Sequence, residues 1–147
     1  MVISKPTGRT LISFSLFLII AFVLVGMSAI TIYNDTNPPW YSYLIVSSLG
    51  PISAFLLFRL IFGYKVIRLG NNQIEIFRPA LNRRVHYKLE QVDHWKESKV
   101  KTGKSTTYKE LEVRFEGGKK IQVGHQEYSN YGPMISYLKK KAGKKER

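Results

Sequence analysis

The side chains best suited to binding chemistry in this sequence are basic, and they gather in two places. The last nine residues hold six lysine or arginine side chains and one glutamate, a net charge of +5. A second cluster surrounds Pro79. The candidate contacts for an anionic lipid or an acidic partner are Arg78, Arg83, Arg84, Lys88, Lys139, Lys140, Lys141, Lys144 and Lys145. Near an anionic membrane each contributes about 1 kcal/mol, screened within about 10 Å. The alternative is that these charges only keep the domain soluble and oriented.

The same search finds no arrangement of side chains typical of an enzyme. The histidines, His86, His94 and His125, lack the spacing of a metal-binding motif. Cysteine is absent, which excludes disulfides, thiolate catalysis and cysteine-ligated metals. The one mixed polar and aromatic cluster lies in residues 93–97 and contains Asp93, His94, Trp95 and Glu97. We therefore expect a non-enzymatic protein with no cofactor and no metal.

Two apolar stretches would place these side chains beside a membrane. Residues 10–33 carry no charge, and residues 41–64 carry one, Arg59. Roughly 20 apolar residues cross a hydrocarbon core of about 30 Å. The short connection, residues 34–40, contains two consecutive prolines, which predicts a tight turn between antiparallel helices.

Aromatic and arginine side chains mark the edges of the second span. Trp40, Tyr41 and Tyr64 are predicted to lie at the membrane interfaces. Arg59 lies about 10 Å from the midplane by helix rise, close enough for its side chain to reach the headgroups. Neither span holds an acidic partner for it, so we predict an anchor rather than a transport charge.

Small residues predict how the two helices pack. A small residue at every fourth position lets membrane helices approach closely. We predict contact between a face of the first span with Gly26 and Ala29 and a face of the second with Ser47, Gly50 and Ala54. The alternative is that this match is accidental.

The flanking charges predict the orientation. Lys5 and Arg9 precede the first span and Lys65 follows the second, whereas the connection carries only Asp35. The positive-inside rule then places both termini in the cytoplasm, for a protein of the cytoplasmic (inner) membrane. The competing interpretation is a cleaved signal peptide over residues 1–29.

The sequence after residue 64 predicts a β-domain closed by a helix. Residues 65–78 alternate around a turn at Asn71 and Asn72, and residues 111–123 form a second clear hairpin. About six short strands follow this pattern. A C-terminal helix is then predicted by an apolar stripe at i, i+3, i+4 and i+7, made of Tyr131, Met134, Ile135 and Leu138.

This order resembles that of small bacterial membrane proteins carrying a pleckstrin-homology-like (PH-like) domain behind a two-helix hairpin. The resemblance covers about residues 64–142 and rests on pattern, with no diagnostic motif. It implies a curved antiparallel sheet or partial barrel capped by the C-terminal helix, and a binding or scaffold role without transferable site residues. The predicted segments are a cytoplasmic N-terminus (1–9), two spans (10–33 and 41–64) joined by an extracytoplasmic turn (34–40), the PH-like domain (65–142) and a basic tail (143–147).

Three functions remain open at this stage. The favoured one is a membrane-anchored scaffold whose domain recruits a partner protein or completes a larger complex. The second is a sensor of anionic lipid that uses the basic tail with Arg83 and Arg84. The third is an accessory or channel-like subunit that works as a homo-oligomer of its helices. The net charge of +13 also suits nucleic acid, but membrane attachment and the lack of an aromatic platform argue against it.

Overall fold

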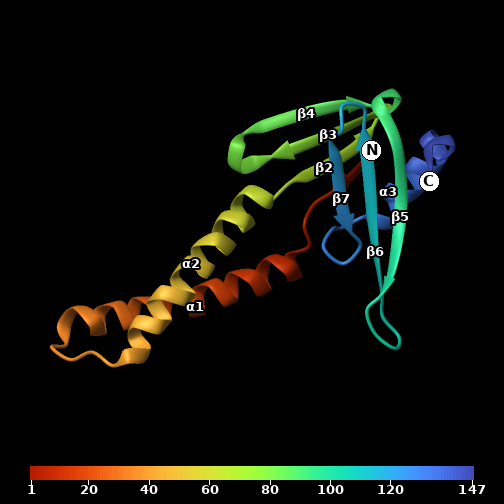
Figure 1. Cartoon of the computed structure of the whole chain (residues 1–147). Coiled ribbons are helices and arrows are strands. Elements are labelled where there is room, and N and C mark those ends of the chain that lie inside the picture. The colour runs from red at the N-terminus through yellow and green to blue at the C-terminus, as the bar shows by residue number, and fades with distance from the viewer. The chain divides into compact units, whose positions relative to one another are not determined.

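The computed structural model describes residues 1–147 and divides the chain into two compact units. One unit, Gly8–Tyr64, is a pair of helices. The other, which we call the β-domain, combines Met1–Thr7 with Lys65–Arg147. The elements of both are labelled in Figure 1. The β-domain is thus assembled from residues on both sides of the helix pair.

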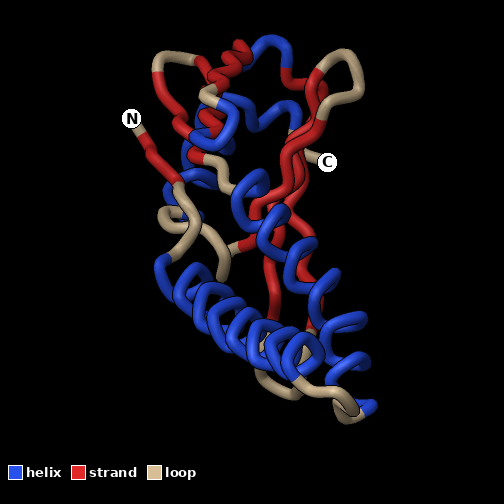
Figure 2. Tube along the Cα trace, turned by 90° about the vertical axis from the view of Figure 1, so that its left-hand side faces the viewer, coloured by secondary structure: helices blue, strands red, loops and turns tan.

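The helix pair consists of α1 (Gly8–Asn34) and α2 (Trp40–Gly63), which run antiparallel to each other (Figures 1 and 2). Both are long and apolar enough to cross a membrane. Most of their side chains are exposed, including large ones such as Phe55 and Phe58. A helix buried in the core of a soluble protein would hide them, whereas a membrane-spanning helix exposes such side chains to lipid.

The helices pack on a different face from the one predicted. Gly26, Ala29, Ser47 and Ala54 are exposed, and a Cβ added at Gly26 or Gly50 would meet no atom within 4 Å. The buried positions are instead Leu18, Ala21 and Ser28 on α1, with Ser42 and Ser53 on α2.

Serine replaces glycine as the small residue at this interface for a simple reason. The Ser53 hydroxyl donates a hydrogen bond to the Leu49 carbonyl at 2.6 Å, so burial leaves no donor unsatisfied. The side chain stays small enough for close helix approach. The prediction also used small residues on one helix face, but the buried face of α1 is the one that carries Ala21 and Ser28.

The β-domain contains two antiparallel sheets and a C-terminal helix, as Figure 2 shows in red and blue. The first sheet has the order β1-β2-β3-β4, and its strands are Val2–Ser4, Val66–Gly70, Gln73–Arg78 and Arg83–Lys88. The second has the order β5-β6-β7, with strands Val92–Lys101, Thr107–Phe115 and Lys120–Gly124. The helix, α3, covers Tyr131–Ala142.

The first strand was not predicted, and it changes the domain boundary. Residues 1–9 were expected to be a separate cytoplasmic segment, but Ile3 and Arg68 are Cα partners in the β1–β2 ladder. The N-terminal strand is also held on its other side. Ser129 donates its backbone N–H to the Lys5 carbonyl at 2.9 Å, and the Asn130 amide donates to the Ile3 carbonyl at 2.8 Å. The domain therefore has seven strands, one more than the count of about six that was expected.

The core of the β-domain lies between the sheets and α3. The predicted apolar stripe of the helix is confirmed, because Tyr131, Met134, Ile135 and Leu138 are all buried. Trp95 on β5 is fully buried, and its indole nitrogen donates to the Ala142 carbonyl at 2.9 Å. This bond satisfies the polar end of the largest core side chain and ties the end of α3 to the second sheet.

Candidate functional site

The predicted basic contacts divide between two sites of the β-domain. Strand β4 explains the division, because successive side chains of a strand point to opposite faces. Arg83 shares a face with Val85 and Tyr87 and lines one site, whereas Lys88 lines the other. Arg84 lines neither; it is exposed, with its guanidinium 5.0 Å from the centre of the Phe77 ring.

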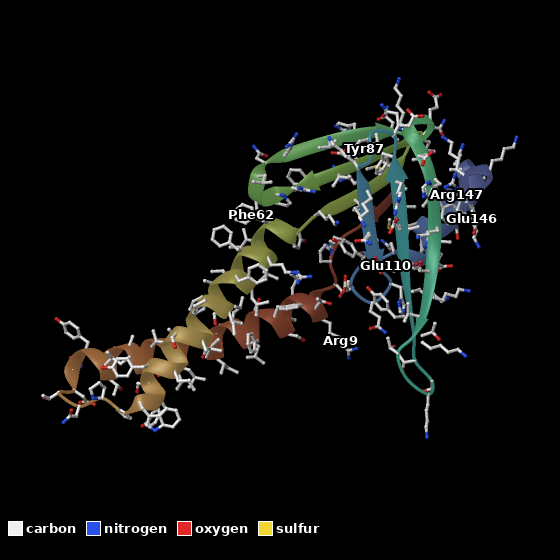
Figure 3. The ribbon with its side chains drawn as sticks, viewed as in Figure 1. Arg9, Phe62, Tyr87, Glu110, Glu146 and Arg147 are labelled. Atoms are coloured by element: carbon white, nitrogen blue, oxygen red, sulfur yellow. The ribbon has the colours of Figure 1, made fainter.

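The first site is a groove of about 310 Å³, which we call the β4–β7 groove. Its walls come from both sheets, and basic side chains surround it without any acidic one. The basic residues are Lys65, Arg78, Arg83, Lys119 and Lys120. Apolar residues line the rest, which are Ile76, Val85, Tyr87, Phe115 and Ile121. Tyr87, labelled in Figure 3, stacks on Phe115 with 4.1 Å between ring centroids and joins the two sheets.

One lining residue of this groove, Lys65, comes soon after the end of α2 in the chain. Lys65 follows Gly63, the last residue of α2, by two positions, and two residues span at most about 7 Å. Arg78 lies across from Lys65, because Val66 and Phe77 are Cα partners. Burial lowers the pKa of Lys65, and the charge of Arg78 lowers it further, while Glu127 partly offsets both. The groove therefore holds crowded positive charge that an anion would relieve.

The second site is a larger pocket of about 920 Å³ at the other end of β2, which we call the lysine pocket. It lies among the β2–β3 turn, the end of β4 and the end of α3. Six lysines and one carboxylate, Glu90, line it. The lysines are Lys88, Lys139, Lys140, Lys141, Lys144 and Lys145.

One of these lysines has a structural role. The Lys145 ammonium donates to three carbonyls, those of Leu89 at 3.2 Å, Glu90 at 2.8 Å and Val92 at 2.6 Å. It thereby fastens η2 (Leu89–Gln91), a 3₁₀ turn between β4 and β5. This engagement removes Lys145 from the predicted set of lipid contacts.

The remaining C-terminal residues also lie on the domain. Residues 143–147, predicted as a basic tail, form a 3₁₀ turn followed by a bridge between Glu146 and Trp95. The Arg147 backbone N–H donates to the Trp95 carbonyl at 2.9 Å, and Figure 3 labels both terminal residues beside β5. The chain end is therefore held by β5, which fixes the position of the lysines that precede it.

The predicted interface anchors lie at the ends of α2 or near them. Trp40 begins the helix and Tyr41 follows it, and both are exposed. Arg59 is exposed within the last two turns, and Tyr64 is the half-buried residue just after the helix.

The mixed cluster of residues 93–97 does not form one site. The His94 Nδ1 lies 2.7 Å from the Asp93 carboxylate, whereas Trp95 is in the core. Glu97 accepts a hydrogen bond from the Tyr131 hydroxyl at 3.2 Å. No group of three or more His, Asp or Glu side chains is placed to hold a metal ion.

The sequence did not predict a small cluster of aromatic and acidic side chains around His125. Its ring lies 5.8 Å from Tyr108 and 6.0 Å from Tyr131 by centroids, and its Nδ1 accepts the Lys109 backbone N–H at 3.0 Å. Burial raises the pKa of Tyr131, and Glu97 raises it further. Tyr131 therefore stays protonated as a hydrogen-bond donor, which suits a structural role.

No protein-family model, curated protein or solved structure matches this chain. The function therefore has to be argued from the two basic sites and from the connectivity of the chain.

Proposed function

We propose that this protein is a membrane-anchored, non-catalytic binding protein whose β-domain engages an anionic partner beside the bilayer. The observation that carries the proposal is the β1–β2 ladder, because its two strands precede α1 and follow α2. If both helices cross a membrane, the paired strands require both connections to emerge on the same side. Both connections are short, so the domain stays near the surface.

The architecture supports a PH-like domain as the binding module. Four antiparallel strands, then three, then a C-terminal helix form the β-domain. The sequence suggested that the helical hairpin precedes the whole domain. In this proposal the hairpin is instead inserted after the first strand of the domain. Cytoplasmic placement rests on the basic flanks, Lys5, Arg9 and Lys65, and belongs to the same proposal.

The favoured partner is an acidic surface of another protein, recruited to the membrane or held in a larger complex. The β4–β7 groove supports this role, since it combines a basic rim with apolar walls. Protein interfaces use this combination, with arginine enriched among the residues that contribute most. Arg78 and Arg83 supply the planar donors for carboxylates.

Anionic lipid is the second candidate, and the position of Lys65 favours it. A groove that begins two residues after α2 is within reach of headgroups if α2 ends at the interface. Three basic side chains near an anionic surface contribute about 3 kcal/mol together, or about 100-fold in affinity.

One purification tests both candidates. The full-length protein is isolated from its native membrane together with the variant Arg78→Gln/Arg83→Gln/Lys120→Gln, and the bound proteins and lipids are identified by mass spectrometry. The matched control is Lys140→Gln/Lys141→Gln/Lys144→Gln, which removes the same charge from the lysine pocket. We expect the groove variant to lose a partner protein that the control retains.

The outcomes separate the candidates. Loss of anionic lipid without loss of any protein would favour the lipid sensor over the scaffold. Identical proteins and lipids in all three samples would contradict a binding role for the β4–β7 groove.

A further inference from the structure

We propose that the lysine pocket is a second binding site, for an anion that carries several phosphate groups. It lies at the opposite end of β2 from the β4–β7 groove, so it is separate from the surface used in the proposed function. Without Lys145, which is held by three carbonyls, five exposed lysines face one carboxylate around about 920 Å³. A single phosphate would neutralise only part of this charge, which favours a multivalent anion.

The side chains that line the pocket favour phosphate over other anions. All its basic groups are lysines, a common type of phosphate ligand, and no arginine is present to hold either a carboxylate or a phosphate with two parallel hydrogen bonds. No aromatic ring lines the pocket either, so a nucleobase would have nothing to stack on. The other polar groups are the amides of Asn71, Asn72 and Gln73, which can donate to phosphate oxygens.

The rim of the pocket is fixed by hydrogen bonds. The Asn72 backbone N–H donates to the Tyr137 hydroxyl of α3 at 3.1 Å, and the Leu89 N–H donates to the Asn72 carbonyl at 2.9 Å. Lys145 holds the adjacent 3₁₀ turn. The β2–β3 turn, η2 and the end of α3 therefore keep their spacing when no ligand is bound, which reduces the entropy cost of binding.

The Glu90 carboxylate and the end of α3 both oppose an anion here. The C-terminus of a helix carries about half a negative charge on its free carbonyls. The Ala142 carbonyl is already bonded to the Trp95 indole, and Lys139, Lys140 and Lys141 lie in the last turn. The lysines outweigh this partial charge, so the pocket remains attractive to anions.

The test uses the full-length protein in nanodiscs, with two phosphate sources. Soluble tripolyphosphate is titrated onto nanodiscs of phosphatidylcholine, and a lipid source is supplied by nanodiscs that contain a phosphatidylinositol bisphosphate. Binding is compared between the wild type, Lys140→Gln/Lys141→Gln/Lys144→Gln and the groove variant Arg78→Gln/Arg83→Gln/Lys120→Gln. Thermal unfolding of each variant checks that exposed substitutions leave the fold intact.

We expect the pocket variant to bind at least one source at least about tenfold more weakly, and the groove variant to change the binding of soluble tripolyphosphate by less than about threefold. Loss of tripolyphosphate binding identifies a soluble ligand, and loss confined to the bisphosphate nanodiscs identifies a lipid headgroup. Equal weakening of tripolyphosphate binding in both variants would reduce the effect to bulk charge and overturn the proposal. Binding of polyglutamate in place of either phosphate source would overturn it as well.

Discussion

The β4–β7 groove and the lysine pocket are both basic, but they differ in what surrounds the charge. The groove places two arginines and three lysines around apolar and aromatic walls, two residues beyond α2. The pocket places lysines around the amides of a polar turn, and one of its lysines is part of the fold. Five strand residues of β2 separate the two sites, which is about 17 Å of chain.

This difference shows that net charge alone does not define a binding surface. Apolar walls add burial of ligand or partner surface to the electrostatic attraction, whereas a polar lysine pocket depends on attraction that salt screens. The groove therefore suits a partner with apolar and acidic groups together, and the pocket suits a compact hydrophilic anion.

The largest expected effect distinguishes a lysine that stabilises the fold from the lysines of the pocket that are free to bind an anion. Lys145→Met removes three charge-assisted hydrogen bonds and should lower the free energy of unfolding by about 2–4 kcal/mol. Lys144→Met, next to it and exposed, is the matched control and should change the stability by less than about 0.5 kcal/mol. Thermal or chemical unfolding of the two variants measures the difference. Equal stabilities would mean that Lys145 contributes no more to the fold than its neighbour.

A smaller effect of opposite sign is expected at the groove. Because burial lowers the pKa of Lys65, its protonated form is penalised in the folded state, and Lys65→Met should raise the melting temperature at pH 7. Between the lowered pKa of Lys65 in the folded state and its ordinary pKa, about 10.4, the unfolded chain binds more protons at this position than the folded chain does. The stability of the wild type should therefore rise with pH in this range, and the advantage of the variant should shrink.

Unfolding at pH 7 and pH 10 measures this change, with Lys119→Met on the groove rim as the control. A variant that is less stable than the wild type at pH 7 would show that Lys65 stabilises the domain. A variant that is more stable than the wild type at pH 7, as expected, would mean that the groove keeps a destabilising charge, as binding sites often do.

Much of the fold could be predicted because its signals are local. Residues 10–33 and 41–64 predicted two helices by apolar length alone, and α1 and α2 match them within a few residues. Alternation predicted the β2–β3 and β6–β7 hairpins. The stripe from Tyr131 to Leu138 predicted the buried face of α3.

The features that escaped prediction depend on contacts between distant residues. Strand β1 has only three residues, too few for alternation to be informative, and its partner Arg68 lies more than sixty positions away. The role of Lys145 depends on carbonyls about fifty-five positions earlier. Alternation along the strand does separate Arg83 from Arg84, because consecutive strand residues point to opposite faces.

Strands from both sides of the helical hairpin complete one β-domain. Antiparallel partners such as Ile3 and Arg68 have Cα atoms about 4.5–5.5 Å apart, within the range of a disulfide, and the chain has no native cysteine. Full-length Ile3→Cys/Arg68→Cys is oxidised in its native membrane and the cross-links are resolved by non-reducing electrophoresis and mass spectrometry. The control is Ile3→Cys/Glu75→Cys, since Glu75 lies one strand further away, beyond disulfide reach at about 10 Å.

Pairing of β1 with β2 in the same chain predicts an intramolecular disulfide in the first variant and none in the control. Absence of that disulfide, or dimers linked between two chains in its place, would contradict a domain that each chain completes with its own N-terminal strand.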